Sequence, residues 1–488
     1  MRRRIVRLAA VLLALLILVV LARALLAGRG TAPSITAAAL PAAPAFSLEA
    51  AARHLGEAVR IRTVSHQDAA LDEAGEWPRL HAWLAATYPL THARAARELI
   101  DGRSLVFTWP GTDPALPPVV LMAHQDVVPV EAGTEGQWRH PPFAGELADG
   151  AVWGRGAIDD KGSLVAIFEA LEALARQGFT PRRTLILVSG ANEEVQGSGA
   201  QAAAALLASR GVHAEFVLDE GLLVLARHPV TGGPVAMIGI AEKGYATLEV
   251  VAHAPGGHSS MPPADTAGLT LARALLAIHA AAAPSRLDGP TQQMLSALAP
   301  DSAFAARLAI ANQWLFAPLL VRQIAATPAG AAMLHTTEAP TMLAGSAKEN
   351  VLPERASAAI NYRLAPGDSS AAVLERATRA VAGLPVTLAW LHAPLEASSV
   401  SSTGSRGWSL IAALGAAAAH GPAAPALMIG GTDSRRLQPV ATDVFRFQPI
   451  TLADEDLAML HGTNERMTLE NLRQAITFYA RLVAAAAS

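Results

Sequence analysis

Three short, continuous apolar runs constrain the fold of this 488-residue chain more than any other feature. They occupy residues 118–123, 184–188 and 215–218, of which the last begins with Glu215 and is apolar after it. Runs of this kind are typical of strands that are buried on both faces of a parallel sheet. Helical patterns at 164–177 and 201–209 separate the runs, and strands that alternate with helices predict an α/β fold.

Each of these predicted strands is followed by side chains that bind metal ions. The side chains are His124 and Asp126 after the first run, Glu193 and Glu194 after the second, and Asp219 and Glu220 after the third. Ligands of open α/β sheets bind beyond the carboxyl ends of the strands. Taken singly, His124 and Asp126 could form an ordinary hydrogen bond, and a Glu-Glu pair could lie in a solvated loop. Together, at consecutive strand ends, the side chains predict a metal site.

The stretch from Gly154 to Ser163 adds a further group, because it holds Asp159 and Asp160 between glycines. Two adjacent carboxylates repel each other unless a cation lies close to them, and a bound metal ion would remove that cost. The alternative is an Asx-type turn that caps the helix after it. The sequence contains no cysteine, so His, Asp and Glu are the side chains available as metal ligands.

The first 30 residues predict a membrane anchor or a signal segment. Arg2, Arg3, Arg4 and Arg7 precede an apolar run at 8–22, and Arg23 follows it. The run is shorter than a full span of about 20 residues, but Arg23 could snorkel and extend it. Positive charge before the run predicts export, with the rest of the chain anchored and facing the periplasm or exterior. Cleavage near Ala24 and secretion is the alternative. Residues 31–45, rich in Ala and Pro, predict a linker.

The pattern from residue 46 onwards divides into a catalytic domain and an inserted lid. The catalytic domain is predicted at 46–240 and again at 397–488. Within 241–396 the order strand, helix, strand, strand, helix, strand predicts a ferredoxin-like lid. Its strands are expected at 244–254, 341–346 with an extension to 350, 356–364 and 386–391, and its helices at 267–280 and 370–383. Residues from about 283 to 337 predict a helical insertion in this lid.

Several motifs, in order along the chain, identify a family. They are Trp138 with Pro141-Pro142-Phe143, Gly154-Arg155-Gly156, Leu218-Asp219-Glu220-Gly221, Gly431-Thr432-Asp433-Ser434-Arg435 and His461-Gly462-Thr463-Asn464-Glu465. With them, residues 48–488 resemble the dinuclear-zinc metallopeptidase family of aminoacylase, acetylornithine deacetylase and glutamate carboxypeptidase. Within that family the chain is most similar to the branch of carboxypeptidase S (Gly-Xaa carboxypeptidase) and N-fatty-acyl-amino-acid hydrolases. The resemblance implies a zinc-peptidase domain with a mixed, largely parallel sheet flanked by helices, and a lid that also serves dimerisation.

The resemblance also implies the cofactor and its ligands. Two Zn²⁺ ions per subunit, for which cobalt can substitute, would be bridged by Asp159. The remaining ligands would be His124 and Asp219 for one ion, and Glu194 and His461 for the other. Glu220 stays open as the alternative to Asp219.

The same resemblance implies the catalytic roles. Glu193 would be the general base, acting on a water that the two metals bridge and activate. Asp126 would orient His124. In this family the peptide between Asp159 and Asp160 is commonly cis.

The lid residues are assigned by resemblance as well. His258, in the segment Gly256-Gly257-His258-Ser259, would stabilise the tetrahedral oxyanion, often in the site of a partner subunit. Asn350 and Arg363 would hold the substrate, and the arginine fork suits a free α-carboxylate. Gly430 and Gly431 would allow backbone contact with the substrate. A surface ion pair on its strand is the alternative for Arg363.

These expectations define a leading function and its alternatives. We expect an exported zinc hydrolase that cleaves the amide bond next to a C-terminal amino acid, in a small peptide or, as an aminoacylase-like alternative, in an N-acyl amino acid. An inactive, membrane-anchored binding protein is the remote alternative, although the base and all five ligand candidates are present. A homodimer through the lid is expected, unless the insertion covers the lid edge. A net charge of −3 without a basic stripe argues against a nucleic acid partner.

Overall fold

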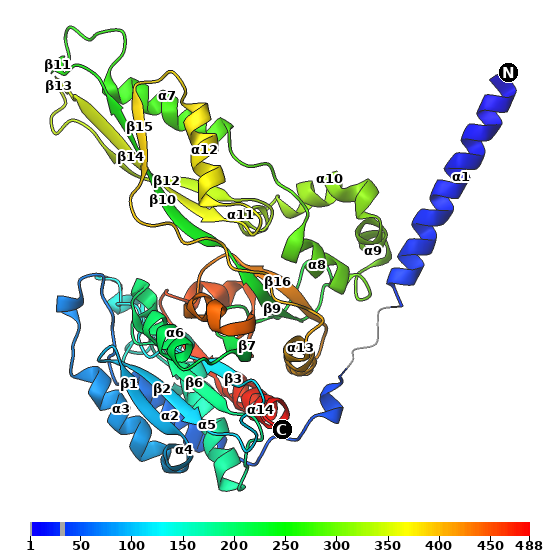
Figure 1. Ribbon diagram of the computed structural model, residues 1–488, viewed down its shortest axis with the longest axis vertical. Helices are drawn as coiled ribbons and strands as arrows, with labels where there is room; N and C mark the ends of the chain where they lie inside the picture. Colours follow the sequence, from blue (N-terminus) through cyan, green and yellow to red (C-terminus); the bar gives the residue numbers. More distant parts are fainter. Residues whose placement is uncertain (1, 30–34) are drawn as a thin grey trace.

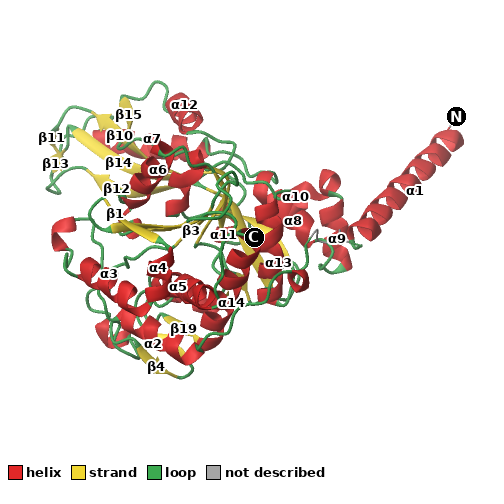
Figure 2. Cartoon of the chain, turned by 60° about the horizontal axis from the view of Figure 1, so that its bottom comes forward, coloured by secondary structure: helices red, strands yellow, loops and turns green. Residues whose placement is uncertain are grey.

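The computed structural model describes residues 2–29 and 35–488 and confirms the predicted fold class. A ten-stranded mixed sheet flanked by helices forms the larger domain, and a four-stranded sheet with two helices forms the lid (Figure 1). A helical insertion lies between the lid and α1 (Arg2–Ala27), which projects away from the rest of the chain (Figure 2).

The three apolar runs form neighbouring strands at the centre of the large sheet. They are β3 (Val119–Met122), β6 (Leu185–Ser189) and β7 (Ala214–Asp219). β3 lies between the other two and is parallel to both, so their carboxyl ends meet at one edge of the sheet. All residues of β3 and β6 are buried, which explains why both strands are apolar up to Ser189, the last residue of β6.

The remaining strands extend this sheet on both sides and form one small sheet. The order is β1 (Ala96–Ile100), β2 (Ser104–Trp109), β6, β3, β7, β17 (Ala441–Arg446), β9 (Val235–Glu242), β8 (Val224–Leu225) and β18 (Thr451–Leu452), with β16 (Ala423–Met428) paired to β9. A separate three-stranded sheet contains β19 (Arg466–Thr468), β5 (Ala151–Trp153) and β4 (Glu146–Ala148).

Helices cover both faces of the large sheet. The larger core cluster joins one face to α2 (Leu48–Val59), α3 (Glu76–Thr87), α5 (Lys161–Arg176), α13 (Arg406–Ala419) and α14 (Leu469–Ala486), with α4 (Pro89–Arg94) beside α5. A second cluster joins the other face to α6 (Gly199–Ser209) and the 3₁₀ helix Asp433–Val440. Burial between these layers holds the strand ends, and the side chains that follow them, in fixed positions.

The lid has the predicted ferredoxin-like topology. Its sheet order is β12 (Thr337–Ala344), β14 (Arg355–Leu364), β10 (Gly244–His253) and β15 (Val386–Trp390), with all neighbours antiparallel. α7 (Ala267–Ala280) and α12 (Ser370–Ala380) pack on it and share a separate apolar core. At the tip far from the large sheet, β11 (Gly257–His258) pairs with β13 (Val351–Leu352) (Figure 1).

The second lid strand differs from the prediction at both ends. β12 begins at Thr337 and ends at Ala344, so it does not extend to Asn350. Its first residues pair with β14, and a bulge follows between Pro340 and Met342. Proline lacks the N–H that a ladder needs, which obscures the strand in the sequence. β12 is an exposed edge strand.

The insertion is helical, as predicted, and packs against the larger domain. It contains α8 (Gly289–Leu298), α9 (Phe304–Ala311), α10 (Gln313–Ile324) and α11 (Pro328–Ala332). Met294 and Leu298 of α8 share a core with Met237 of β9 and Ala424 of β16. The insertion therefore leaves the edge of the lid at β12 exposed.

Part of the predicted linker is docked on the larger domain. Residues 31–34 lie outside the described part of the chain, but Ile35, Leu40 and Ala43 pack against the main core. Arg481 of α14 donates a hydrogen bond to the carbonyl of Pro41 at 2.9 Å. Helix α1, which precedes this segment, is long and apolar enough to cross a membrane.

Candidate metal centre and substrate pocket

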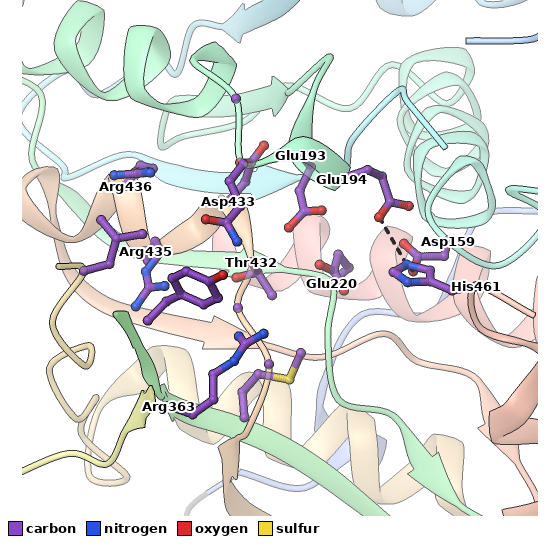
Figure 3. A pocket seen from close by; sticks show the side chains of 17 residues that line it. Asp159, Glu193, Glu194, Glu220, Arg363, Thr432, Asp433, Arg435, Arg436 and His461 are labelled. Carbon is purple, nitrogen blue, oxygen red and sulfur yellow. Dashed lines mark ion pairs between the residues drawn. The ribbon is translucent and has the colours of Figure 1, made fainter. Parts of the chain in front are cut away.

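Several chain segments bring carboxylates and imidazoles together at the carboxyl edge of the large sheet. His124 follows β3, and Glu193 begins the 3₁₀ helix Glu193–Val195 that follows β6. Asp159 lies just before α5, and His461 comes from the loop before β19. Figure 3 shows Glu193, Asp159 and His461 in one part of a pocket of about 390 Å³. The sequence pattern therefore identified residues that are far apart in the chain and close in space.

Asp159 lies between two histidines. Its Oδ1 is 2.9 Å from His124 Nε2, and its Oδ2 is 3.2 Å from His461 Nε2. His461 Nε2 is also 3.1 Å from Glu194 Oε2. A carboxylate that reaches one imidazole with each oxygen is placed as a bridging ligand would be. The peptide between Asp159 and Asp160 is cis.

Asp126 connects the histidine to the loop of the two glutamates. It is fully buried, and its carboxylate accepts hydrogen bonds from the N–H groups of Glu193 at 3.1 Å and Glu194 at 3.2 Å. The Ser65 hydroxyl donates to it as well. Its own carbonyl oxygen is 2.9 Å from His124 Nδ1. One residue thus fixes His124 and both glutamates in relation to each other.

Asp219 and Glu220 face different surroundings. The Asp219 carboxylate is buried and accepts hydrogen bonds from the N–H of Glu220 at 2.9 Å and of Ser434 at 2.8 Å. Glu220 lines the pocket, and Figure 3 shows its carboxylate between Thr432 and His461. Of the two residues, Glu220 is the one that presents oxygen atoms to the pocket.

The pocket holds more carboxylates than its histidines can balance. Burial raises the pKa of Glu193 and Glu220 well above the ordinary value, and neighbouring carboxylates raise it further. Burial and the nearby Asp219 raise the pKa of Asp433 to about 8. Asp159 differs, because hydrogen bonds from His124 and His461 outweigh its burial and hold its pKa below the usual range.

These residues fit a bound divalent cation. The ligand atoms of His124, Asp159 and Glu194 lie within 4.8 Å of one another. Within the described residues, Glu194 Oε1 and Asp433 Oδ2 are buried without a hydrogen-bond partner, which is rare for polar atoms. Imidazoles and carboxylates are the ligands that zinc takes when cysteine is absent. The raised pKa values mean that, without a cation, some of the pocket carboxyl groups hold a proton. A bound cation would replace these protons, because metal ligands bind in their deprotonated form.

Glu465 is a site residue that the sequence did not reveal. Its Oε2 accepts hydrogen bonds from Arg155 Nη1 at 2.7 Å and Gly156 N at 3.0 Å. Its Oε1 accepts from Ile158 N at 2.8 Å and Asp159 N at 3.1 Å. Glu465 therefore holds the turn that carries Asp159. Glu465 ends the motif at 461–465, but its partners lie 306 to 310 positions away, and no local pattern shows such contacts.

Arginines and glycines line another part of the pocket (Figure 3). The Arg363 guanidinium lies 4.8 Å from the centre of the Tyr245 ring, and among the described residues it has no ion pair. The surface ion pair considered for Arg363 is therefore wrong. Gly430 and Gly431 line the same pocket, as do the apolar side chains of Tyr245, Leu395 and Met428.

His258 and Asn350 are not brought to this pocket within one chain. His258 lies on β11 at the tip of the lid and is exposed, with its Nδ1 2.8 Å from the Ser260 hydroxyl. Asn350 lies next to it, since its carbonyl accepts a hydrogen bond from Ser259 N at 3.2 Å. The Asn350 Oδ1 atom is buried without a hydrogen-bond partner in the described chain. The two predicted lid residues thus form a pair away from Arg363.

Comparisons with known proteins show which proteins this chain is similar to. The model of peptidase family M20/M25/M40 matches residues 120–485. Probable carboxypeptidase S-like 2 from Dictyostelium discoideum is 34% identical over 442 residues, which cover 88% of this chain and 84% of that protein. The N-fatty-acyl-amino acid synthase/hydrolase PM20D1 from Xenopus tropicalis is 35% identical over 441 residues, covering 87% and 84%. The structure of the M20 family metallo-carboxypeptidase Sso-CP2 from Sulfolobus solfataricus shares the fold, with a TM-score of 0.65, 17% identity and coverage of 89% and 98%.

Proposed function

Because the chain belongs to peptidase family M20/M25/M40 and is a metal-dependent hydrolytic enzyme, we propose that it cleaves the amide bond next to a C-terminal amino acid. The observation that carries the proposal is the two-part pocket of about 390 Å³. Carboxylates and imidazoles gather in one part, and Arg363 faces the other. This spacing of opposite charges suits a substrate whose scissile carbonyl lies near a free carboxylate.

Two zinc ions are the proposed cofactor. Asp159 would bridge them, His124 would hold one ion, and Glu194 with His461 would hold the other. We propose Glu220 as the remaining ligand in place of Asp219, because Glu220 lines the pocket and Asp219 does not. When bound, the ions supply Lewis acidity toward the scissile carbonyl and make a water molecule more acidic.

Glu193 is the proposed general base. Its backbone N–H is held by Asp126 at 3.1 Å, and its carboxylate lines the pocket. Glu193 would accept a proton from the attacking water and deliver it to the nitrogen of the leaving amine.

Arg363 is the proposed partner of the substrate carboxylate. Tyr245 supports its guanidinium from one side, which limits the rotamers that binding must freeze. A planar guanidinium binds a carboxylate through two parallel hydrogen bonds. The backbone at Gly430 and Gly431 would line the path of the substrate.

Hydrolysis of N-acyl amino acids is the second candidate. In both reactions an amide bond next to a free carboxylate is hydrolysed. The substrates differ only in the acyl group on the other side of that bond. The apolar side chains of Tyr245, Leu395 and Met428 favour it, as does the similarity to an N-fatty-acyl-amino acid synthase/hydrolase.

The proposal includes export and attachment to a membrane. Helix α1 carries arginines at its N-terminal end and a long apolar stretch after them, so we propose an uncleaved anchor with the remaining chain on the outer side. Secretion after cleavage is the alternative. A mature N-terminus after Ala24 or Ala27 would exclude the anchor.

Paired variants of the two adjacent glutamates test the mechanism. Glu193→Gln should reduce kcat at least 100-fold while metal content stays near that of the native enzyme, because Glu193 transfers a proton and is not a ligand. Glu194→Gln should lower both metal content and activity. The assay is a panel of dipeptides and N-acyl amino acids, combined with metal analysis. Loss of metal in Glu193→Gln, or substantial remaining activity, would contradict the assignment.

A further inference from the structure

Helix α10 is an apolar helix without a single buried residue. From Gln313 to Ile324, polar side chains occur only at Gln313, Arg322 and Gln323. Trp314 is 58% exposed, Leu315 42% and Leu319 54%. Residues four positions apart lie on the same face of a helix, so these side chains and exposed Pro318 form one apolar face that ends at Arg322. Soluble proteins rarely leave a contiguous apolar face of this kind open to water.

This face is held beside the C-terminal end of α1. Helices α9 and α10 form an elbow, with a bend of 119° at Asn312. Asn312 Nδ2 donates a hydrogen bond to the carbonyl of Val20 at 3.0 Å, and Arg23 Nε donates to the carbonyl of Ala311 at 2.9 Å. Val20 and Ala24 are the buried residues of α1. The elbow is thus attached to the last two turns of α1.

The position of this contact places the elbow at the boundary of a membrane. The central part of α1, residues 8–22, carries no charge. Arg7 and Arg23 flank it and can extend their side chains toward the two surfaces of the membrane. With snorkelling included, this length approaches the roughly 30 Å of a hydrocarbon core. Arg23 then marks the outer boundary, and the elbow that binds Val20 and Arg23 lies at the same depth. Figure 1 shows α10 running across the direction of α1, as a helix in the plane of a bilayer would.

The charges of the insertion agree with this placement. The stretch 302–337 contains Arg307 and Arg322 but no aspartate or glutamate. Tryptophan is favoured at the interface between water and lipid, and helices that lie in this interface carry Trp and Leu on one face and Arg or Lys on the polar face.

We propose that the elbow is a second membrane contact, with the exposed face of α10 lying in the outer interface of the bilayer beside α1. Its partner is the lipid surface. Trp314, Leu315 and Leu319 would enter the boundary between headgroups and acyl chains, and Arg322 would remain among the headgroups. This inference rests on the proposed anchor and adds to it, because a second contact would fix how the pocket is oriented above the membrane.

The absence of cysteine from the sequence allows a direct test in the full-length chain. Leu315→Cys and Leu319→Cys, each labelled with an environment-sensitive fluorophore, report on the face of α10. Leu13→Cys in the middle of α1 reports on the anchor. Leu276→Cys is the matched control, because Leu276 is a helical leucine of the lid that is 71% exposed. Each protein is reconstituted into vesicles of phosphatidylcholine and phosphatidylglycerol, with and without nitroxide-labelled phosphatidylcholine.

We expect lipid nitroxides to quench the label at positions 13, 315 and 319 several-fold more than at position 276. Quenching at 13 but not at 315 and 319 would overturn the interface while leaving the anchor intact. A blue shift at 315 without lipid quenching would show that protein covers the face, and would overturn the proposal as well. Absence of quenching at 13 would refute the anchor, and the interface with it.

Discussion

The position of Asp159 depends on a side chain that need not touch the substrate. Glu465 accepts four hydrogen bonds, from Arg155, Gly156, Ile158 and Asp159 itself. Each carboxylate oxygen of Glu465 accepts two of these hydrogen bonds. An amide NH₂ group in place of either oxygen would therefore point its own N–H bonds at two N–H donors. Glu465 is therefore a positioning residue for the proposed bridging ligand.

We expect Glu465→Gln to lower the free energy of unfolding by about 3 kcal/mol, since it leaves the buried Arg155 without a charged partner. Metal affinity should fall about 10- to 100-fold, as for other groups that orient a ligand. Chemical denaturation and metal titration measure the two effects. Glu470→Gln is the control, because Glu470 pairs with Arg473 on the exposed face of α14 and should cost less than about 1 kcal/mol. Equal effects of the two substitutions would contradict this role.

Asp219 and Glu220 can be separated by the same kind of experiment. Glu220→Gln should reduce the metal content of the enzyme while leaving thermal stability nearly unchanged, because Glu220 faces the pocket. Asp219→Asn should mainly destabilise the fold, because its carboxylate holds the N–H of Ser434. Metal analysis and thermal melting of the two variants show which of the two residues is the ligand. A loss of metal confined to Asp219→Asn would restore Asp219 as the ligand.

The contrast between these residues shows what the sequence could predict. His124 and Glu193 follow strands whose continuous apolar sequence is a local signal, so the meeting of their side chains was predictable. The choice between Asp219 and Glu220 depends on how the chain leaves β7, since consecutive side chains point in opposite directions. The role of Glu465 depends on contacts across 306 to 310 positions, which no local pattern contains.

At the scale of elements, the segment before α2 is more than a spacer. Leu40 packs against the main core, and Arg481 binds the carbonyl of Pro41. The composition of 31–45 predicted a linker but not this docking, because contacts with distant helices decide whether such a segment is ordered.

We expect a chain that begins at Ile35 to be more stable than one that begins at Ala45, although both should be soluble and active. The free energy of unfolding of the shorter chain should be lower by about 2–4 kcal/mol, because it loses the apolar burial and the hydrogen bonds of the docked segment. Thermal melting measures it. Leu40→Ser should reproduce part of the loss, whereas Leu71→Ser, at a leucine that is 63% exposed, should have little effect. Identical melting of the two truncated chains would show that the docking contributes nothing.

At the scale of the whole molecule, the proposed site is divided between domains. Arg363 reaches the pocket from the lid, and the metal-type ligands come from the large sheet. The chain crosses between the domains at two points, where Tyr245 and Leu395 exchange backbone hydrogen bonds of 2.8 Å. The lid tip with His258 and Asn350 projects away from this pocket (Figure 1). The described chain thus provides two lid residues that its own pocket does not use.

In a homodimer, His258 and Asn350 would contribute to the pocket of the partner subunit. The edge strand β12 is exposed, with Met342 68% and Leu343 71% exposed, and the insertion packs against β16 rather than over this edge. An unpaired, apolar edge strand is suited to pairing with a second copy. We propose that in a two-fold dimer each lid tip lies at the other pocket, where His258 would stabilise the oxyanion.

Complementation between two inactive variants tests this exchange. Glu193→Ala leaves His258 intact, and His258→Ala leaves Glu193 intact, so a mixed dimer contains one site with both groups. Equal co-expression should restore about one quarter of the native activity, because about half of the dimers are mixed and each has one complete site. Glu193→Ala combined with a chain that carries both substitutions is the control, and it should stay inactive. If mixed dimers are confirmed by mass and remain inactive, His258 does not act across the interface. A monomer with full activity would refute the dimer itself.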